Sequence, residues 1–389
     1  MENKLVYVIG SQGGVYFGKY QLQSWVENIN KVLISNCFKV TTFTAGYHRD
    51  SYIKNDVKVF ISRRIPFFLD PFSLDIPLKL LFYERPLFVI IHGLQHFLTL
   101  LSLLVLSIRN IPVVLIVHGL YKETKNNIVS FLRDSILKQF LRFTKLPYLL
   151  IALTNYDKLL LLKEWRIPIN KIIISKVFLY INSEELRMIE KIKRSDIECR
   201  KNVDKVRFLY VGRLDYHQKR IDRLIKIFYQ YLMNLKLQNC CGVELIIIGE
   251  GPMRPFISRM VKKLKIENNI KVIGSVSEKE KWRLYLTGIA LVLTSEFEGL
   301  PRTFYEAFAA GNIVIAPNIC GLGEVIYNGV NGYLFNNESE LFEILTFILG
   351  NKEKVAEMGY KNYEQTKKEL ILENNEIELI KIFDKLLSR

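Results

Sequence analysis

Short apolar runs recur along the chain and alternate with longer stretches of helical periodicity. In the first half they predict six strands: Leu5–Ile9, Phe38–Phe43, Val57–Ile61, Leu87–Ile91, Val113–Val117 and Leu149–Ala152. Uninterrupted runs of Val, Ile and Leu are typical of parallel strands buried on both faces. The alternation of such strands with helical segments favours an α/β fold with a doubly wound parallel sheet.

A second series of apolar runs follows a charged stretch. It predicts strands at Arg207–Val211, Glu244–Ile248, Ile270–Ile273, Leu291–Leu293, Ile313–Ala316 and Tyr333–Phe335. Helical patterns such as Asp222–Leu235 and Met253–Leu264 separate them, and a charged amphipathic segment, Ser339–Leu387, ends the chain. The sequence therefore predicts two Rossmann-like domains in tandem.

The 389 residues suit two such domains. We divide the chain into an N-terminal domain at 1–181, a linker with a short helix at 182–206, a C-terminal domain at 207–365, and a last helix at 366–389 that could pack back on the N-terminal domain. Ligands bind at the carboxyl ends of the strands in open parallel sheets. Two domains facing each other would form a cleft there.

Three features bear on the compartment. The apolar stretch Phe97–Ile108 is 12 residues long, whereas a membrane span needs ~20, so we expect a buried or surface-docked helix. Residues after Met1 run straight into a strand without the apolar region of a signal peptide. The five cysteines are scattered, without CxxC or metal-ligand spacing. We therefore expect a protein of the reducing cytoplasm without a bound metal.

The charge balance is strongly basic, with a net charge of +16. Residues 1–150 hold 18 Lys and Arg against 9 Asp and Glu, so the N-terminal part is the more basic. Such an excess attracts phosphates or an anionic membrane surface, although a solvated basic surface explains it equally well. The sequence lacks a nucleic-acid-binding signature, so we expect no nucleic-acid partner.

Glu298 and Glu306 flank seven residues at a strand-to-helix junction. The helix would begin near Thr303 and end at Gly311 as its C-cap. Free backbone N–H groups around Leu300–Thr303 would form an anion site at the helix N-terminus. Glu306 could then accept hydrogen bonds from a diol. Alternatively, Glu298 is a loop residue and Glu306 an exposed helical side chain.

A second polar segment, Gly212–Lys219, follows the strand that ends at Val211. Arg213 and Lys219 flank its turn, where a fixed guanidinium and ammonium suit a leaving diphosphate. Exposed basic loop residues are the alternative. At the next strand end, Gly249–Pro252 predicts a tight turn with close backbone approach.

Together these segments resemble glycosyltransferase family 4, the group 1 glycosyltransferases, which have the two-domain GT-B fold. Gly212–Lys219 resembles the family's Gly-Arg…Lys signature, Gly249–Pro252 its Gly-x-Gly-Pro turn, and Glu298–Glu306 its E-x7-E motif. Gly321–Glu324 and Asn331–Phe335 match the end of the family pattern. The resemblance is dense over about 207–335.

The resemblance implies a role for each matching residue of the donor site. Arg213 and Lys219 would hold the donor diphosphate, Glu306 the ribose, and Glu298 the donor sugar near its reacting face. The remaining donor-site candidates are Gly274 and Val276 beside the nucleobase and the helix start at Leu300, Pro301, Arg302 and Thr303. Family members are generally retaining and need no metal ion or other cofactor.

The N-terminal domain matches the family more loosely. Gly13 and Gly14 resemble the glycine pair near the donor phosphates, although Val15 replaces the polar residue that usually follows. His118 stands where the family places a histidine that hydrogen-bonds the donor sugar, and His92 ends the preceding strand. A structural histidine is the alternative for both. The family's Pro-Asn-Gly-Val-Asp segment is replaced here by Ser175–Asn182.

The sequence thus predicts a retaining glycosyltransferase that moves a sugar from a nucleotide-sugar, with a UDP-sugar favoured. The acceptor would be a glycan or lipid-linked oligosaccharide at the inner face of the membrane, in bacterial surface polysaccharide synthesis. Two alternatives remain: another GT-B enzyme, such as a nucleotide-sugar epimerase or a phosphorylase, and a non-catalytic nucleotide-sugar-binding protein.

Overall fold

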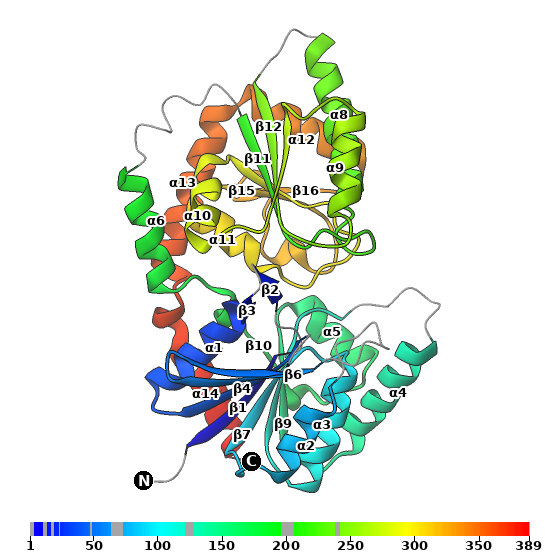
Figure 1. Ribbon diagram of the computed structural model, residues 1–389, viewed down its shortest axis with the longest axis vertical. Helices are drawn as coiled ribbons and strands as arrows, with labels where there is room; N and C mark the ends of the chain where they lie inside the picture. Colours follow the sequence, from blue (N-terminus) through cyan, green and yellow to red (C-terminus); the bar gives the residue numbers. More distant parts are fainter. Residues whose placement is uncertain are drawn as a thin grey trace. The chain divides into compact units, whose positions relative to one another are not determined.

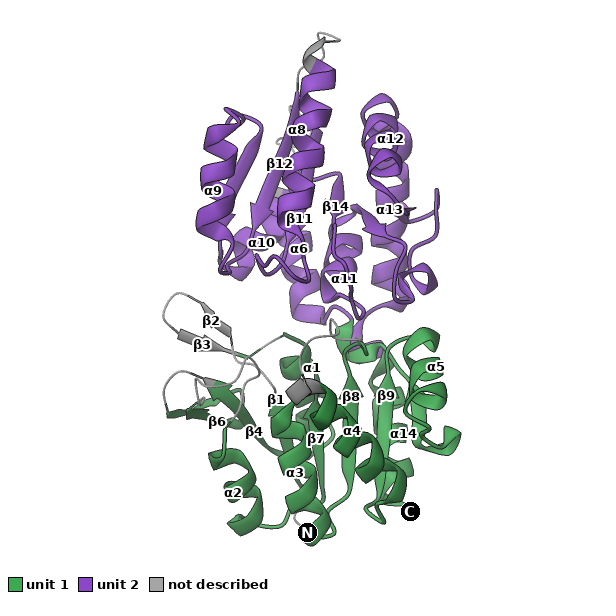
Figure 2. Cartoon of the chain, turned by 90° about the vertical axis from the view of Figure 1, so that its right-hand side faces the viewer, with its two compact units in different colours: residues 1–179, 375–389 green, residues 180–374 purple. Residues whose placement is uncertain are grey.

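The computed structural model describes residues 4–388, except 11–13, 17–18, 23, 47–48, 64–72, 121–127, 196–205 and 238–241. The chain divides into two compact units (Figure 2). The first unit comprises Met1–Leu179 and Asn375–Arg389, and the second comprises Tyr180–Asn374. The C-terminal residues therefore belong to the same unit as the N-terminal ones.

The first unit is built on an eight-stranded sheet in the order β10-β9-β8-β7-β1-β4-β6-β5. Its strands are β1 (Leu5–Gly10), β4 (Lys39–Gly46), β5 (Asp50–Lys54), β6 (Val57–Arg63), β7 (Phe88–His92), β8 (Val113–Val117), β9 (Tyr148–Ala152) and β10 (Ile172–Ile174). All neighbours pair in parallel except β5 with β6. Every residue of β7 and β8 is buried. This confirms the prediction that such strands are buried on both faces of the sheet.

Helices cover this sheet: α1 (Ser24–Ser35), α2 (Asp75–Phe82), α3 (Phe97–Ile108), α4 (Ile128–Phe143), α5 (Asn155–Lys163) and most of α14 (Leu372–Leu387). Short 3-10 turns are η1 (Ile169–Lys171) and η2 (Val177–Leu179), and a separate hairpin pairs β2 (Gly14–Tyr16) with β3 (Lys19–Gln21). Helix α3 buries Leu98, Leu103 and Leu106 in the core, so the apolar stretch is a core helix. Among the described residues, no helix is both long and apolar enough to cross a membrane.

The second unit has a six-stranded sheet in the order β13-β12-β11-β14-β15-β16. Its strands are β11 (Val206–Val211), β12 (Val243–Ile248), β13 (Ile270–Gly274), β14 (Ala290–Val292), β15 (Ile313–Pro317) and β16 (Gly332–Phe335), all paired in parallel. Counted within the unit, this is the order 3-2-1-4-5-6 of the Rossmann fold. The prediction of two Rossmann-like sheets is confirmed, with each predicted strand displaced by at most a few residues.

Its helices are α6 (Ser183–Ser195), α8 (Ile221–Leu237), α9 (Arg254–Lys263), α10 (Glu278–Thr287), α11 (Arg302–Ala310), α12 (Glu338–Gly350) and α13 (Lys352–Glu369), with the 3-10 turn η3 (Leu322–Glu324) (Figure 1). Helix α11 ends at Gly311, which has a φ of 81° in the left-handed region. The predicted glycine C-cap is therefore present.

The short helix predicted within 182–206 is present, but it belongs to the second unit and not to a linker between the units. Helix α6 occupies Ser183–Ser195 and packs against α10 and α11 of the second unit. Its charged sequence concealed a narrow apolar stripe in which Ile189 and Ile192 are buried. The described part of this segment is thus an element of the second unit.

Two short strands of the first sheet escaped sequence analysis. Strand β5 lies at the edge and is largely exposed, so it lacks an apolar pattern. A two-residue turn, Asn55-Asp56, joins it to β6, with φ values of 49° and 62°, the left-handed conformation of a tight hairpin. Strand β10, at the other edge, has only three residues.

A glycine-dependent contact joins the loops after β11 and β12. The φ of Gly249 is 147°, and a Cβ at this position would collide with the carbonyl oxygen of Gly212. The two loops are also joined by hydrogen bonds from Leu214 N–H to the Glu250 carbonyl oxygen at 2.9 Å and from Met253 N–H to the Leu214 carbonyl oxygen at 3.1 Å. The glycine therefore permits the close approach that the sequence predicted.

Replacing Gly249 with alanine is expected to destabilise the second unit by about 1–3 kcal/mol, since the backbone must shift to relieve the collision. Gly350→Ala is the matched control: a Cβ there meets no other atom within 4 Å, so no loss is expected. Amide hydrogen exchange of β12 measures the stability of the second unit in both variants. Equal protection of β12 in the two variants would contradict the close-approach argument.

Candidate donor site in the second unit

The sequence-predicted donor residues gather at the carboxyl edge of the second sheet. Arg213 and Lys219 follow β11, and Glu298 follows β14. These two strands are hydrogen-bonded neighbours at the point where the strand order reverses. This topological switch point is where open α/β sheets bind ligands.

Lys219 and Glu298 form a direct ion pair. The distance from Lys219 Nζ to Glu298 Oε1 is 2.6 Å, and the Ser295 hydroxyl donates to the same oxygen at 2.6 Å. Gln218 Nε2 lies 3.4 Å from Glu298 Oε2. Because the Glu298 side chain is only 5% exposed and that of Lys219 16% exposed, the pair is largely shielded from water. The structure therefore brings together two residues that are 79 positions apart.

Asp215 organises the loop that carries these cations. Its Oδ1 accepts the backbone N–H groups of Gln218 at 2.7 Å and Lys219 at 3.0 Å. Its Oδ2 accepts Arg213 Nε at 2.7 Å. Burial alone would raise the pKa of Asp215, yet these N–H groups and the guanidinium hold it below its usual value. The carboxylate thus stays ionised and fixes the loop.

Arg213 keeps much of its side chain in solvent, with 53% exposed. Its Nη2 donates to Gln218 Oε1 at 2.9 Å. Gln218 therefore links the arginine to the Lys219–Glu298 pair. Asp215 and Gln218 were not among the sequence candidates, although both lie inside the Gly212–Lys219 segment.

The residues after Glu298 lead directly into α11. Pro301 is the N-cap and supplies no side-chain cap, while Arg302 and Thr303 open the first turn. The first N–H groups of a helix have no acceptor within the helix. Pro301 and Thr303 are partly exposed and Leu300 is buried. The predicted helix start is confirmed, and its backbone polarity suits an anion.

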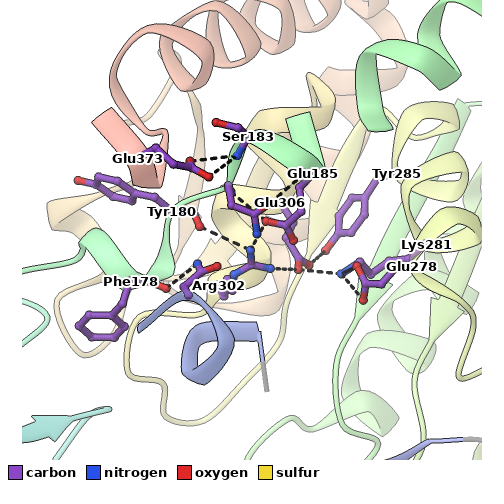
Figure 3. Close-up of polar contacts among 12 residues, drawn as sticks. Phe178, Tyr180, Ser183, Glu185, Glu278, Lys281, Tyr285, Arg302, Glu306 and Glu373 are labelled. Atoms are coloured by element: carbon purple, nitrogen blue, oxygen red, sulfur yellow. Dashed lines mark hydrogen bonds and ion pairs between the residues drawn. The ribbon is translucent and has the colours of Figure 1, made fainter. Parts of the chain in front are cut away.

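The Glu306 side chain lies in a buried ion-pair network (Figure 3). Its Oε1 accepts Arg302 Nη1 at 2.7 Å and Lys281 Nζ at 3.0 Å, and its Oε2 accepts the Tyr285 hydroxyl at 3.1 Å. Burial opposes ionisation, but Lys281 and Arg302 hold the pKa of Glu306 below its usual value. Glu306 is therefore a buried carboxylate, which excludes the alternative of an exposed helical glutamate.

Arg302 connects this carboxylate to α6. Its Nη2 donates to Glu185 Oε2 at 2.6 Å and lies 3.5 Å from the Tyr180 carbonyl oxygen (Figure 3). Nearby, Ile181 N–H donates to the Leu370 carbonyl oxygen at 3.3 Å, and Leu372 N–H donates to the Ile181 carbonyl oxygen at 2.9 Å. The Arg302 side chain thus points toward α6 and the segments at 180–183, which sequence analysis did not foresee.

Gly274 ends β13 with a φ of 90°, and Val276 follows two residues later. Glu250 lies against this turn: its Oε1 accepts Ser275 N–H at 3.2 Å and Arg254 Nη1 at 2.7 Å. The segment predicted to lie beside the nucleobase therefore has a carboxylate and a guanidinium next to it. Arg254 follows the Gly-x-Gly-Pro turn, Gly249–Pro252, by two residues in the sequence. This position could have marked Arg254 as a candidate donor-site residue.

In the first unit, His92 and His118 lie side by side. His92 ends β7 and His118 directly follows β8, the strand paired with β7. His92 Nδ1 lies 3.0 Å from His118 Nε2. The Trp25 ring lies over both imidazoles, with centroid distances of 4.1 Å to His92 and 4.4 Å to His118. Gly14 begins β2, and Gly13 lies outside the described residues.

Both imidazoles are held neutral. Burial, with a contribution from His118, places the pKa of His92 well below its ordinary value. Burial, with a contribution from His96, lowers the pKa of His118 to about 3. The unfolded chain binds protons on these groups near pH 6.5 and the folded chain does not. Their contribution to stability is therefore complete above pH 6.5 and is lost as the pH falls toward 3.

Lowering the pH from 6.5 to 5 should consequently destabilise the first unit by up to ~1.4 kcal/mol per pH unit for each histidine. Hydrogen exchange of β7 and β8, corrected for the intrinsic pH dependence of exchange, measures this loss. In a variant with His92→Leu and His118→Leu, the stability of the first unit should depend much less on pH. If the stability of that variant still fell with pH as in the wild type, the pH dependence could not be assigned to these two imidazoles.

Among the described residues, no group of three His, Cys, Asp or Glu side chains is placed to hold a metal ion.

Comparison with known proteins adds to this geometry. Residues 192–365 match the family described as glycosyl transferases group 1. The second unit is a group 1 glycosyltransferase domain.

Relatives of this glycosyltransferase domain are found in bacteria and archaea. The chain is 31% identical over 129 residues to an uncharacterized glycosyltransferase of Methanocaldococcus jannaschii, 32% over 124 residues to the glycogen synthase of Mycobacterium tuberculosis, and 31% over 134 residues to the lipopolysaccharide 1,6-galactosyltransferase of Escherichia coli. Each match covers 32–33% of this chain. The matched stretch spans only 28–34% of each relative.

Solved structures extend the similarity to the fold of the whole chain. The sucrose-phosphate synthase of Thermosynechococcus elongatus aligns with a TM-score of 0.73 at 14% identity, over 99% of both chains. The Anabaena protein HepE, solved with UDP-glucose, aligns with a TM-score of 0.69 at 14% identity, over 98% of this chain and 99% of its own. The group 1 domain thus belongs to a chain with the GT-B fold, as predicted.

Proposed function

We propose that the protein transfers a sugar from a nucleotide-sugar to an acceptor hydroxyl, with retention of the anomeric configuration. The observation that carries this proposal is the cluster of Arg213, Lys219 and Glu298 at the switch point of the second sheet. Two cations and a helix N-terminus suit a diphosphate, and the buried carboxylate suits the hydroxyls of the adjoining sugar. In this assignment Arg213 and Lys219 bind the diphosphate and Glu298 the sugar.

The proposed reaction breaks the bond between the anomeric carbon and the β-phosphate oxygen. The acceptor oxygen forms the new bond on the same face, and its proton passes to the leaving phosphate. Charge that develops on the diphosphate is stabilised by Arg213, Lys219 and the first N–H groups of α11. Because Lys219 and Ser295 hold Glu298, we assign this carboxylate to binding the sugar and not to covalent catalysis.

We propose a uridine nucleotide as the donor, with Gly274 and Val276 beside the base. This choice is supported by the fold shared with HepE, which was solved with UDP-glucose. Glu306 would bind the ribose: within the described part of the chain its Oε2 accepts one hydrogen bond, from Tyr285, and a carboxylate oxygen can accept a second. We propose that His118 contacts the donor sugar from the first unit, with Gly14 near the donor phosphates.

Three outcomes of one assay distinguish the candidate functions. The protein is incubated with UDP-, GDP- and CMP-sugars, with and without glycan and lipid-linked acceptors. Acceptor-dependent release of UDP or GDP, and a product whose anomeric proton shows retention, are the expected results; a CMP-sugar donor would instead release CMP. Epimer formation without acceptor would favour an epimerase. Tight binding without turnover on any acceptor would favour a binding protein.

A lipid-linked acceptor at the inner face of the membrane is supported by the surface of the first unit. Helices α2, α3 and α4 follow one another along it (Figure 1). Each exposes an apolar stripe, together called the apolar patch: Leu78 and Phe82, Leu104 and Ile108, and Leu132, Ile136 and Phe143. Exposed basic residues lie nearby in the chain at Arg85, Arg142 and Lys145. An apolar surface with a basic rim suits anionic lipid. A further apolar stretch of the sequence that could contact the membrane, Phe67–Leu69, lies outside the described residues.

The double substitution Phe82→Glu and Ile108→Glu is expected to abolish co-sedimentation with phosphatidylglycerol-containing vesicles. Both side chains are more than three-quarters exposed, at 78% and 77%, so folding should survive. Ile377→Glu, at another exposed isoleucine of the first unit, is the control and should keep wild-type binding. Unchanged binding of the double variant would contradict the membrane assignment.

A further inference from the structure

The imidazoles of His92 and His118 cannot adopt arbitrary tautomers. His92 Nδ1 and His118 Nε2 lie 3.0 Å apart, and a hydrogen bond at this distance requires one nitrogen to donate and the other to accept. Both rings are neutral, so each carries a single proton. Fixing the donor therefore fixes the tautomer of both residues.

The surroundings of His92 decide between the two arrangements. His92 is fully buried, and within the described residues its Nε2 has no hydrogen-bond partner. If Nε2 carried the proton, a buried N–H would lack an acceptor, and orphaned buried N–H groups are rarer in proteins than under-satisfied acceptors. The proton therefore belongs on His92 Nδ1, which donates to His118 Nε2 and leaves the His118 proton on Nδ1.

Ring contacts hold this pair in one orientation. Trp25 covers both imidazoles, and the Phe178 ring meets them edge-on, at 6.3 Å from His92 and 5.9 Å from His118 between centroids. The Asn28 side-chain amide donates to the Phe178 carbonyl oxygen at 3.0 Å. The rings are thus restrained, and the partner of His118 Nε2 is set by the structure.

We propose that His92 is a positioning residue that fixes His118 as its Nδ1–H tautomer. His118 then presents a defined donor nitrogen, while Nε2 is reserved for His92. The choice of tautomer determines which ring nitrogen can act on a ligand. The consequence for transfer rests on the proposed function of His118, whereas the tautomer itself does not.

Two-bond proton–nitrogen NMR spectra of the nitrogen-labelled full chain test the proposal directly, with the His118 signal assigned by its loss in His118→Gln. The Nδ1–H tautomer is expected in the wild type. His92→Leu removes the donor and should shift His118 away from that tautomer. In His92→Asn the side-chain amide can replace the imidazole Nδ1–H and should restore it. An Nε2–H form in the wild type, or no change in His92→Leu, would overturn the proposal.

The hydrolysis of UDP-glucose, measured on the same variants, separates this proposal from the proposed function. A loss of about 10- to 100-fold is expected in His92→Leu, by analogy with histidine ligands that lose their orienting partner, with substantial recovery in His92→Asn. In a His118→Gln background, His92→Leu should cause little additional loss. A changed tautomer with unchanged turnover would refute the role of His118 in the reaction and leave the positioning intact.

Discussion

Replacing Lys219 with methionine is expected to weaken UDP binding by about 10- to 100-fold, because a hydrogen bond to a charged group contributes about 1.5–3 kcal/mol. Sugar transfer should fall further, by about 10²–10³-fold, since the same ammonium would stabilise the charge that develops on the leaving diphosphate. Calorimetric titration with UDP measures the first effect, and release of UDP from UDP-glucose measures the second.

Two further variants make this result interpretable. Lys219→Met leaves Glu298 buried without its cation, which can itself destabilise the fold. Lys219→Met with Glu298→Gln removes both charges and should recover stability without recovering UDP binding. Lys226→Met, at an exposed lysine of α8, removes the same charge elsewhere and should bind UDP normally. Wild-type UDP affinity in a well-folded double variant would refute the assignment of this pair to the donor site.

Replacing Arg302 with methionine is expected to destabilise the second unit by about 3–5 kcal/mol, the usual cost of removing one partner from a buried ion pair. The guanidinium joins Glu185 at 2.6 Å and Glu306 at 2.7 Å, and its side chain is 6% exposed. Both carboxylates would lose their shared cation, although Glu306 would keep Lys281. Hydrogen exchange of α11 reports the loss for this unit alone.

An exposed ion pair in the same unit provides the comparison. Arg283 lies 3.7 Å from Glu280, with both side chains nearly half exposed, so Arg283→Met should cost no more than ~1 kcal/mol. Adding Glu185→Met to Arg302→Met should recover part of the loss, because one orphaned carboxylate is removed. Equal effects of Arg302→Met and Arg283→Met would show that the buried network contributes little to stability.

The location of the candidate donor site could be predicted from the sequence because it depends on local patterns. Apolar runs located β11 and β14, and the polar residues that follow them had to lie at the carboxyl edge of the sheet. The helical stretch from Thr303 and the C-cap glycine Gly311 marked the two ends of α11. Each of these signals lies within a few residues of the element that it predicts.

The partners of the site residues could not be predicted in the same way. Glu185 reaches Arg302 across 117 positions, from a helix whose charged sequence suggested a linker. Lys281 and Tyr285 reach Glu306 from α10, where a lysine and a tyrosine carry no distinctive pattern. Likewise, no spacing rule links His92 to His118, although His92 ends β7 and His118 directly follows the neighbouring strand β8. Such contacts depend on packing between elements, which periodicity does not encode.

We propose that the switch point of the second sheet binds a nucleotide-sugar through Lys219 and Glu298. Thermal unfolding of the wild type and of the Lys219→Met, Glu298→Gln double variant, in the presence of UDP-, GDP- and CMP-sugars, tests it most directly. At about 100 times its Kd, one of these donors should stabilise the wild type by ~2.7 kcal/mol and leave the double variant almost unchanged. Binding of a nucleotide-sugar at this switch point is contradicted if no nucleotide-sugar stabilises the wild type, or if the two proteins are stabilised equally.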